Sequence, residues 1–278
     1  MRARDGSHLV ERAVFSIPNV LKSLIKRLLN FKPPGNIEPK RGDCWLVSYP
    51  RSGNTWLRFI AANLIFRNKE ITFKTIDDLI PDIYARNSWR IERQKPPRVF
   101  KSHEPYNNLY GNVVYMVRNP FAVCNSYFRY LLKTGAYENE DDFDSYFSKF
   151  LKGKLDDYGS WKENVASWIY PRKNNRNFLL LNYELMREDP IGEVGRLAKF
   201  LGIESDRRRL EEVIQLCSMD RMKKLEDSQW RSWSSTAGTR RDLRFIDSSE
   251  NLKGNYLNER QKEGLRKDFD HVMAELGY

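Results

Sequence analysis

The sequence has few cysteines and no long apolar run. Its three cysteines, Cys44, Cys124 and Cys217, are too few and too far apart for a disulfide framework or a zinc cluster, so we interpret them as reduced thiols. No stretch approaches the roughly 18 to 20 apolar residues of a membrane-spanning helix, and the first residues lack the apolar core of a signal peptide. We therefore expect a cytoplasmic protein.

Internal repeats and strong compositional bias are also missing, which argues against a solenoid, a propeller or a collagen-like chain. The 278 residues are 40% hydrophobic and 13% aromatic, which is enough to build a core. Lys and Arg outnumber Asp and Glu by 48 to 37, so the formal charge is +11. This excess favours anionic partners such as nucleic acid, anionic lipid, phosphorylated cofactors or acidic glycans, without choosing among them.

Residues 1–40 are predicted to be an extension that precedes the main domain at residues 41–278. Within residues 18–31, apolar side chains recur at helical spacing among lysines and arginines, and Pro33-Pro34-Gly35 then ends the helix. Two interpretations of this basic amphipathic helix are open. We favour packing against the domain, and the alternative is peripheral contact with an anionic membrane.

Short apolar strands alternate with helical segments after residue 43. The pattern predicts strands at residues 44–49, 98–102, 113–117 and 178–181, and helices that begin near Thr55, at Pro120 and at Pro190. Asn119 is a suitable N-cap for the helix that begins at Pro120. This alternation is typical of a single α/β domain with a mostly parallel sheet flanked by helices. Ligands of such sheets bind where strand carboxyl ends meet helix amino ends.

Residues 48–56, SYPRSGNTW, join a predicted strand to a predicted helix. Backbone N–H groups and the positive end of the helix dipole converge there, which suits a phosphate. Gly53 would let the backbone approach the anion, and Ser52, Asn54 and Thr55 add side-chain donors. The Gly-x-x-x-x-Gly-Lys-Ser/Thr spacing of the nucleotide-kinase P-loop is absent. The alternative is an ordinary turn capped by Thr55.

Two further pairs of polar side chains lie at the ends of predicted strands. Lys101 and His103 are two residues apart on an extended chain, so both side chains would face one site. There the imidazole can take a hydroxyl proton, and the ammonium can stabilise negative charge on a leaving oxygen. Arg118 follows another predicted strand, and Ser126 lies about two turns into the next helix, so both side chains would bind one phosphate. The alternatives are surface charges, a capping histidine and a neutral helix position.

In these three elements the sequence resembles the cytosolic-type sulfotransferases, whose sulfuryl donor is 3′-phosphoadenosine 5′-phosphosulfate (PAPS) and whose nucleotide product is adenosine 3′,5′-bisphosphate (PAP). The resemblance covers most of residues 43–201 and continues more loosely to residue 278. It implies a P-loop-like strand-loop-helix for the sulfate-side phosphate, a second site for the ribose 3′-phosphate, and a tyrosine by the adenine. The residues implied in donor binding are Arg51, Ser52, Gly53, Asn54, Thr55, Trp56, Arg118, Ser126 and Tyr183.

The resemblance also implies catalytic roles. His103 would be the base in an in-line transfer to a hydroxyl acceptor, while Lys101 and Arg51 would stabilise the bridging oxygen. Arg51 stands where many members of the family have Lys, so a planar guanidinium replaces a compact ammonium. No metal is expected, because no carboxylate or His/Cys cluster has metal-ligand spacing.

The resemblance departs from the family pattern near the C-terminus. Asp247 stands where the family has the arginine of a clamp on the 3′-phosphate. Either Arg240, Arg241 or Arg244 substitutes for that arginine, or the clamp is missing.

The acceptor pocket is predicted only as three loops, at residues 77–93, 137–159 and 229–251. The last contains Trp230 and Trp233 among arginines, which would stack on a ring and hold an acid, or alternatively pack on the domain. We expect a small-molecule or glycan acceptor, with a carbohydrate or another bulky hydroxyl compound slightly preferred, and no nucleic acid partner. The sequence does not predict the oligomeric state.

Three other functions are alternatives to sulfuryl transfer. A phosphoryl-transfer P-loop kinase would need the missing Lys-Ser/Thr pair and an acidic magnesium ligand. A non-enzymatic binder of nucleic acid or anionic membrane is suggested by the charge excess and by the basic amphipathic helix within residues 18–31, but scattered basic residues are more often a solvated surface. An inactive relative that binds nucleotide is disfavoured by the presence of Lys101 together with His103.

Overall fold

The computed structural model describes residues 37–84, 98–233, 236, 238–246 and 256–278. The predicted helix within residues 18–31 lies outside the described residues, as does Asp247. Within the described ranges, no helix combines the length and the apolar character needed to cross a membrane. The cytoplasmic location stays a prediction.

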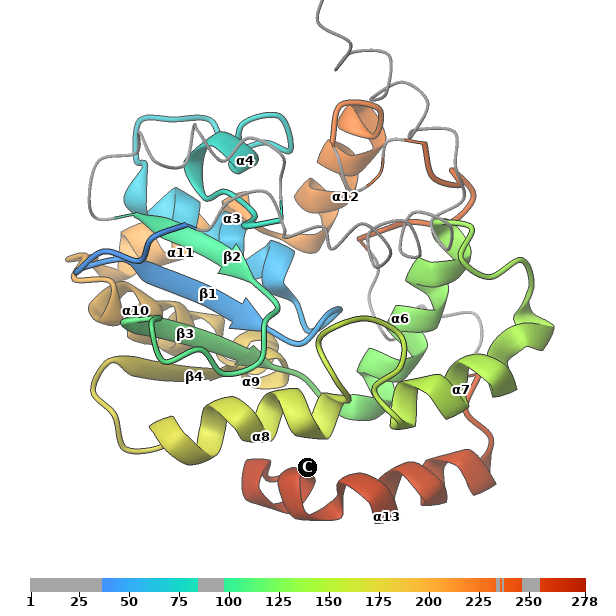
Figure 1. Ribbon diagram of the computed structural model, residues 1–278. Helices are drawn as coiled ribbons and strands as arrows, with labels where there is room; N and C mark the ends of the chain where they lie inside the picture. The colour runs from blue at the N-terminus through green and yellow to red at the C-terminus, as the bar shows by residue number, and fades with distance from the viewer. Residues whose placement is uncertain (1–36, 85–97, 234–235, 237, 247–255) are drawn as a thin grey trace, which may run out of the picture.

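Within the described residues, four parallel strands form the central sheet in the order β2-β1-β3-β4 (Figure 1). Their bounds are Cys44–Ser48 for β1, Val99–Ser102 for β2, Asn112–Val117 for β3 and Phe178–Asn182 for β4. The register pairs Val47 of β1 with Ser102 and with Tyr115 on its two neighbours. The predicted α/β fold with a parallel sheet is therefore confirmed, and each predicted strand lies within one residue of its observed bounds.

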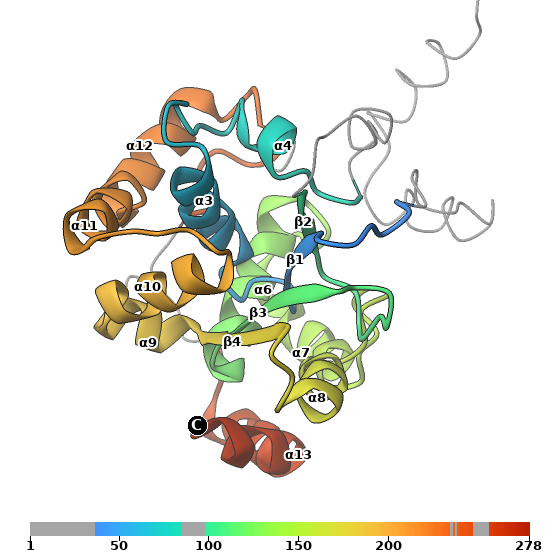
Figure 2. The same ribbon diagram turned by 90° about the vertical axis from the view of Figure 1, so that its left-hand side faces the viewer.

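Both faces of the sheet are covered because alternate strand residues are apolar on each face. Trp45 and Val47 of β1 point into one hydrophobic cluster, and Cys44 and Leu46 point into the other. All five residues of β1 are buried, as expected for a central strand of a parallel sheet. Figure 2 shows the sheet between two groups of helices.

The helices on the first face follow β3 or close the chain. They are α6 at Pro120–Lys133, α7 at Phe143–Leu151, α8 at Trp161–Arg172 and α13 at Glu259–Leu276, with the 3-10 turn η1 at Glu140–Asp142 before α7. As predicted, α6 begins at Pro120, and the Asn119 side chain caps it by accepting the Phe121 N–H at 2.9 Å.

The helices on the second face follow β1 or β4. They are α3 at Asn54–Ile65, α4 at Ile76–Leu79, α9 at Tyr183–Glu188, α10 at Pro190–Phe200, α11 at Arg207–Leu216 and α12 at Met219–Gln229. Helix α10 begins at the predicted Pro190, and Gly202, with a φ of +69°, follows its end.

The chain leaves β1 and β3 toward opposite faces of the sheet. After β1 it forms α3 on one face and returns to the β2 edge, whereas after β3 it forms α6 on the other face and proceeds to β4 (Figure 1). Neighbouring parallel strands whose connections diverge in this way leave a crevice at their carboxyl ends. The fold therefore places a ligand site beyond the ends of β1 and β3.

Candidate active site

A cavity of about 550 Å³ opens at the carboxyl edge of the sheet. Every strand contributes to its wall through the residues that follow the strand: the loop before α3 after β1, His103 after β2, Arg118 after β3 and Tyr183 after β4. Basic residues outnumber acidic ones in the lining, which includes Asp82 as the acidic side chain. The cavity therefore suits an anionic ligand.

The loop between β1 and α3 turns tightly because two residues adopt left-handed backbone conformations. Arg51 has a φ of +68°, unlike any other described non-glycine residue, and Gly53 has a φ of +98°. A Cβ atom at Gly53 would lie 2.7 Å from Cδ2 of Tyr183, so glycine is required both for its conformation and for the close approach. No side chain caps the start of α3, so its first N–H groups are left for a ligand.

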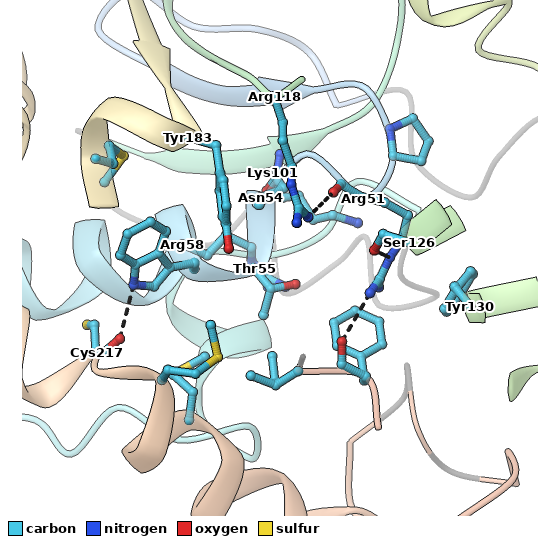
Figure 3. Close-up of a pocket in the computed structure, with 18 of the residues that line it drawn as sticks. Arg51, Asn54, Thr55, Arg58, Lys101, Arg118, Ser126, Tyr130, Tyr183 and Cys217 are labelled. Carbon is cyan, nitrogen blue, oxygen red and sulfur yellow. Dashed lines mark hydrogen bonds between the residues drawn. The ribbon is translucent and has the colours of Figure 1, made fainter. Parts of the chain in front are cut away.

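The predicted donor-binding side chains of this loop divide into two groups. The Ser52 hydroxyl is buried, has no hydrogen-bond partner among the described residues and is not part of the cavity lining, whereas Thr55 lines the cavity without being the helix cap (Figure 3). The Asn54 amide instead donates to Leu46 O at 3.1 Å and to Ser48 Oγ at 3.2 Å. Asn54 therefore fixes the end of β1, and its amide N–H groups are already used.

The His103 ring is held in one orientation by the main chain of β1. Its Nδ1 lies 2.7 Å from the carbonyl oxygen of Ser48. A carbonyl only accepts hydrogen bonds, so Nδ1 carries the proton and Nε2 of the neutral ring is left as an acceptor. Burial, and then the Lys101 ammonium, lower the pKa of His103 from 6.5 to about 3. The imidazole is therefore neutral at physiological pH.

Lys101 lines the same cavity, as the alternation along β2 predicts. Its ammonium is ion-paired with Asp82, which forms an isolated parallel bridge with β2, and it lies 5.9 Å from the centre of the Tyr84 ring. Burial opposes ionisation of Asp82, but Lys101 and Arg58 outweigh it and lower the pKa of that carboxyl. Asp82 therefore stays ionised as the ion-pair partner of Lys101.

Arg118 is 5% exposed and lies over the ring of Tyr183, with its guanidinium carbon 4.2 Å from the ring centre. It donates from Nη1 to the carbonyl of Arg51 at 3.1 Å, while its Nε has no partner among the described residues. Burial lowers the pKa of the guanidinium. Arg118 is therefore held in place by one bond and keeps a buried donor for a ligand.

The start of α6 beside Arg118 is fixed by a carboxylate from α9. Glu184 accepts the Asn119 N–H at 3.0 Å through one oxygen and the Tyr278 hydroxyl at 2.8 Å through the other. The Tyr278 hydroxyl also accepts from the Asn182 amide at 3.0 Å. The ends of β3, β4 and α13 are thereby joined by hydrogen bonds.

The Arg51 side chain does not stay over its own loop. Its Nε donates to Ser126 Oγ at 3.2 Å and its Nη2 donates to the carbonyl of Phe245 at 3.0 Å (Figure 3). The guanidinium carbon lies 5.1 Å from the Tyr130 ring centre and 4.3 Å from that of Phe245. Burial lowers the pKa of Arg51 to about 10, so it remains protonated at neutral pH.

The far end of the cavity is apolar, and of its residues the sequence pattern predicts only Trp56 and Tyr183. The Trp56 indole donates to the carbonyl of Cys217 at 3.0 Å and contacts the Tyr183 ring edge-on at 5.5 Å. Additional lining residues there are Met186, Ile214, Ser218, Met219 and Met222. Two rings and several thioether and aliphatic side chains suit a flat aromatic group such as a nucleobase.

Each predicted acceptor loop contributes to the lining where it is described. The residues are Asp82 and Tyr84 from the first loop, Tyr158 from the second, and Trp233, Phe245 and Ile246 from the third. Trp233 is also packed as the alternative predicted, since it is 2% exposed and stacks on Phe73 at 4.1 Å. Trp230 lies 4.8 Å from the Lys133 ammonium and is not in the lining.

None of the three arginines considered for the C-terminal clamp lines the cavity. Arg240 pairs with Asp242 at 2.6 Å, Arg244 pairs with Asp227 at 3.0 Å, and Arg241 lies 5.6 Å from the Trp230 ring. In the part of the chain that the structure describes, no group of three or more His, Cys, Asp or Glu residues is arranged to hold a metal ion.

Comparison with known proteins agrees with this geometry. Residues 41–277 match the family model for the sulfotransferase domain. Mouse sulfotransferase 4A1 is 33% identical over 189 residues, which cover 63% of this chain and 65% of that protein. The matched part therefore spans slightly less than two-thirds of the length of such curated relatives.

Solved structures of similar fold include two that were crystallised with PAP. Mouse sulfotransferase SULT7A1 has a TM-score of 0.65 at 24% identity, covering 91% of this chain and 88% of that one. Retinol dehydratase, crystallised with retinol and PAP, has a TM-score of 0.71 at 17% identity, covering 88% of this chain and 85% of that one. These similarities show the fold, and the match over residues 41–277 shows that the chain belongs to the sulfotransferase domain family.

Proposed function

We propose that this protein is a sulfotransferase that transfers the sulfuryl group of PAPS to a hydroxyl acceptor and releases PAP. The observation that carries the proposal is a set of N–H donors left for a ligand in one cavity: the buried Nε of Arg118, which has no partner among the described residues, and the first N–H groups of the uncapped α3. Buried polar groups are rarely left without partners, so these atoms fit a ligand with phosphate oxygens. Family membership and the PAP bound to similar structures support the same nucleotide.

The proposed donor site runs across the ends of β1, β3 and β4. The loop of residues 51–56 and the first N–H groups of α3 would bind the sulfate-side phosphate. Arg118 and Ser126 would bind the ribose 3′-phosphate, and Trp56 and Tyr183 would enclose the adenine. When bound, the donor supplies an electrophilic sulfur joined to a stable leaving group.

His103 is the proposed catalytic base. Its protonated Nδ1 is held by Ser48, so Nε2 is free to accept the proton of an acceptor hydroxyl. The low pKa ensures that the ring is not already protonated. Lys101 would stabilise the negative charge that grows on the leaving oxygen. Arg51 was predicted to share this role, but its contacts with Ser126 and Phe245 favour a different one.

The acceptor would enter beside Tyr84 and Tyr158. These rings lie 5.6 Å apart, and Tyr158 also meets the His103 ring edge-on at 5.7 Å. Aromatic faces with hydroxyl groups, beside the Lys101–Asp82 pair, offer both stacking and hydrogen bonds. This lining supports a carbohydrate or another bulky hydroxyl compound, because such acceptors present both ring faces and hydroxyls.

Two measurements on the purified protein test the proposal. Titration calorimetry should show PAP binding, and incubation with radiolabelled PAPS should transfer label to members of a panel of sugars, phenols, lipids and tyrosine peptides. ATP with magnesium serves as the control donor, and phosphate transfer from it would instead support a kinase. Absence of PAP binding would refute the proposal, whereas binding without transfer to any acceptor would support the inactive relative.

A further inference from the structure

The side chain of Arg51 joins three separate parts of the fold. It leaves the loop before α3, meets Ser126 of α6, and reaches the carbonyl of Phe245 in the segment after α12 (Figure 3). Arg118 holds the Arg51 carbonyl, and Arg51 keeps a left-handed backbone that a residue with a Cβ rarely adopts. Such a conformation persists only where surrounding contacts fix it.

The hydrogen bonds around Arg51 leave several donors available. A guanidinium has five N–H groups, and the structure uses one on Ser126 and one on Phe245. The Ser126 hydroxyl accepts from Arg51, so its own proton is free to be donated. Together with the unpartnered Nε of Arg118, these groups form a set of donors at one end of the cavity. The set suits a phosphate, which offers three acceptor oxygens.

The carbonyl that orients Arg51 is itself fixed by a buried carboxylate. Glu226 of α12 is 4% exposed and accepts the N–H of Phe245 at 2.6 Å and that of Ile246 at 2.8 Å. Lys133 of α6 is 2% exposed, lies 3.9 Å from the Glu226 carboxylate, and donates to the carbonyl of Arg240 at 2.8 Å. The segment of residues 240–246 is thereby tied to two helices.

We propose that Arg51 recognises the 3′-phosphate of the nucleotide, and that Glu226 is the positioning residue that holds Phe245, and through it Arg51, in place. The proposal rests on the proposed function, because it assigns the 3′-phosphate to the Ser126 end of the cavity. Arg51 then supplies the second guanidinium that Arg240 and Arg244 do not supply, since those two are paired with Asp242 and Asp227 outside the cavity.

The decisive experiment compares two probes that differ in one phosphate. PAP carries the 3′-phosphate and AMP lacks it, so the ratio of their dissociation constants measures recognition of that group alone. We expect Arg51→Ala to lower the affinity for PAP by about 10- to 100-fold and to change the affinity for AMP by less than about threefold. Calorimetry on the full chain, with displacement titrations for weak AMP binding, gives both constants.

Glu226→Gln tests the positioning role of Glu226 while keeping a side chain of similar size in its buried position. The amide keeps one acceptor for the two N–H groups, so we expect a partial loss of about three- to tenfold in PAP affinity and again little change for AMP. Arg244→Ala is the matched control, because it removes an exposed arginine from the same segment, and both affinities should be unchanged. A general loss of structure would lower both affinities together and would be visible in the thermal midpoint.

The outcomes separate the inference from the function on which it rests. If wild-type protein does not bind PAP, the proposed function fails. If wild-type protein binds PAP and Arg51→Ala weakens PAP and AMP equally, or lowers kcat with both affinities unchanged, Arg51 acts at the sulfate side and the inference is wrong. If Arg244→Ala selectively weakens PAP, the clamp belongs to the C-terminal segment and the inference is also wrong.

Discussion

The two ends of the cavity carry positive charge in different ways. At the nucleotide end, neither Arg51 nor Arg118 forms an ion pair with a carboxylate of the described residues. At the acceptor end, Lys101 is paired with Asp82. Unpaired buried charge is unfavourable until an opposite charge arrives, whereas a paired ammonium is already compensated. The difference supports the proposal that one end binds an anion and the other a neutral hydroxyl compound.

The largest effect is expected from His103→Ala, which separates the two ends. Loss of the base should lower kcat by about 100- to 10,000-fold, while PAP binding stays within about twofold, because His103 belongs to the acceptor end. Single-turnover kinetics and calorimetry give the two quantities. Turnover near the wild-type rate would remove His103 from the mechanism, and a parallel loss of PAP affinity would show that the ends are not independent.

Arg118→Gln should weaken the nucleotide end next most strongly. Removing a buried guanidinium with a free donor should lower PAP affinity by about 10- to 100-fold, and the loss should shrink as ionic strength rises. Arg196→Gln is the matched control, since Arg196 is half-exposed and pairs with Glu193 away from the cavity. Equal affinities for Arg118→Gln and wild type would argue against an anion at this end.

Asp82→Asn removes the carboxylate that pairs with Lys101, so the acceptor end, like the nucleotide end, would carry a positive charge without an ion-pair partner. An additional uncompensated charge in the cavity should raise PAP affinity by about two- to fivefold and should favour acidic acceptors over neutral ones. Calorimetry and a paired assay with neutral and acidic acceptors measure these changes. A decrease in PAP affinity would mean that Asp82 organises the site instead of offsetting its charge.

The smallest effect concerns pH. A base must be unprotonated to act, so activity is lost as pH falls through the pKa of His103, which burial places at about 3. Arg51, with a pKa of about 10, loses its charge only as pH rises through that value. We therefore expect kcat/KM for the donor to stay level between about pH 5 and pH 8. A half-maximal rate near pH 6.5 would show an ordinary, solvated histidine.

Sequence predicted the local structure around the loop of residues 48–56 and the start of α6 because the signals there are local. A strand, a turn with Gly53 and a helix are adjacent in residues 48–56, and Asn119 caps α6 within two residues of its own position. Parallel strands then bring their carboxyl ends together, so His103 and Arg118 were expected at one edge from topology alone.

The remaining features depend on contacts between residues far apart in the chain. The direction of the Arg51 side chain is set by Phe245, 194 residues away, and no local pattern reveals that pairing. Asp82 meets Lys101 through an isolated bridge of the sheet edge, which periodicity does not predict. Met219 and Met222 line the cavity because α12 packs into the same hydrophobic cluster as α3, and the sequence of a half-buried helix does not reveal that packing.

Tyr278 also matters for how the protein is handled. Its hydroxyl is bound to Glu184, which in turn holds the N–H of the residue next to Arg118. A purification tag fused directly to Tyr278 would disturb its hydrogen bond with Glu184. A weakened nucleotide affinity in such a preparation would therefore reflect the tag. A long Gly/Ser spacer between Tyr278 and the tag should keep the tag from disturbing this connection.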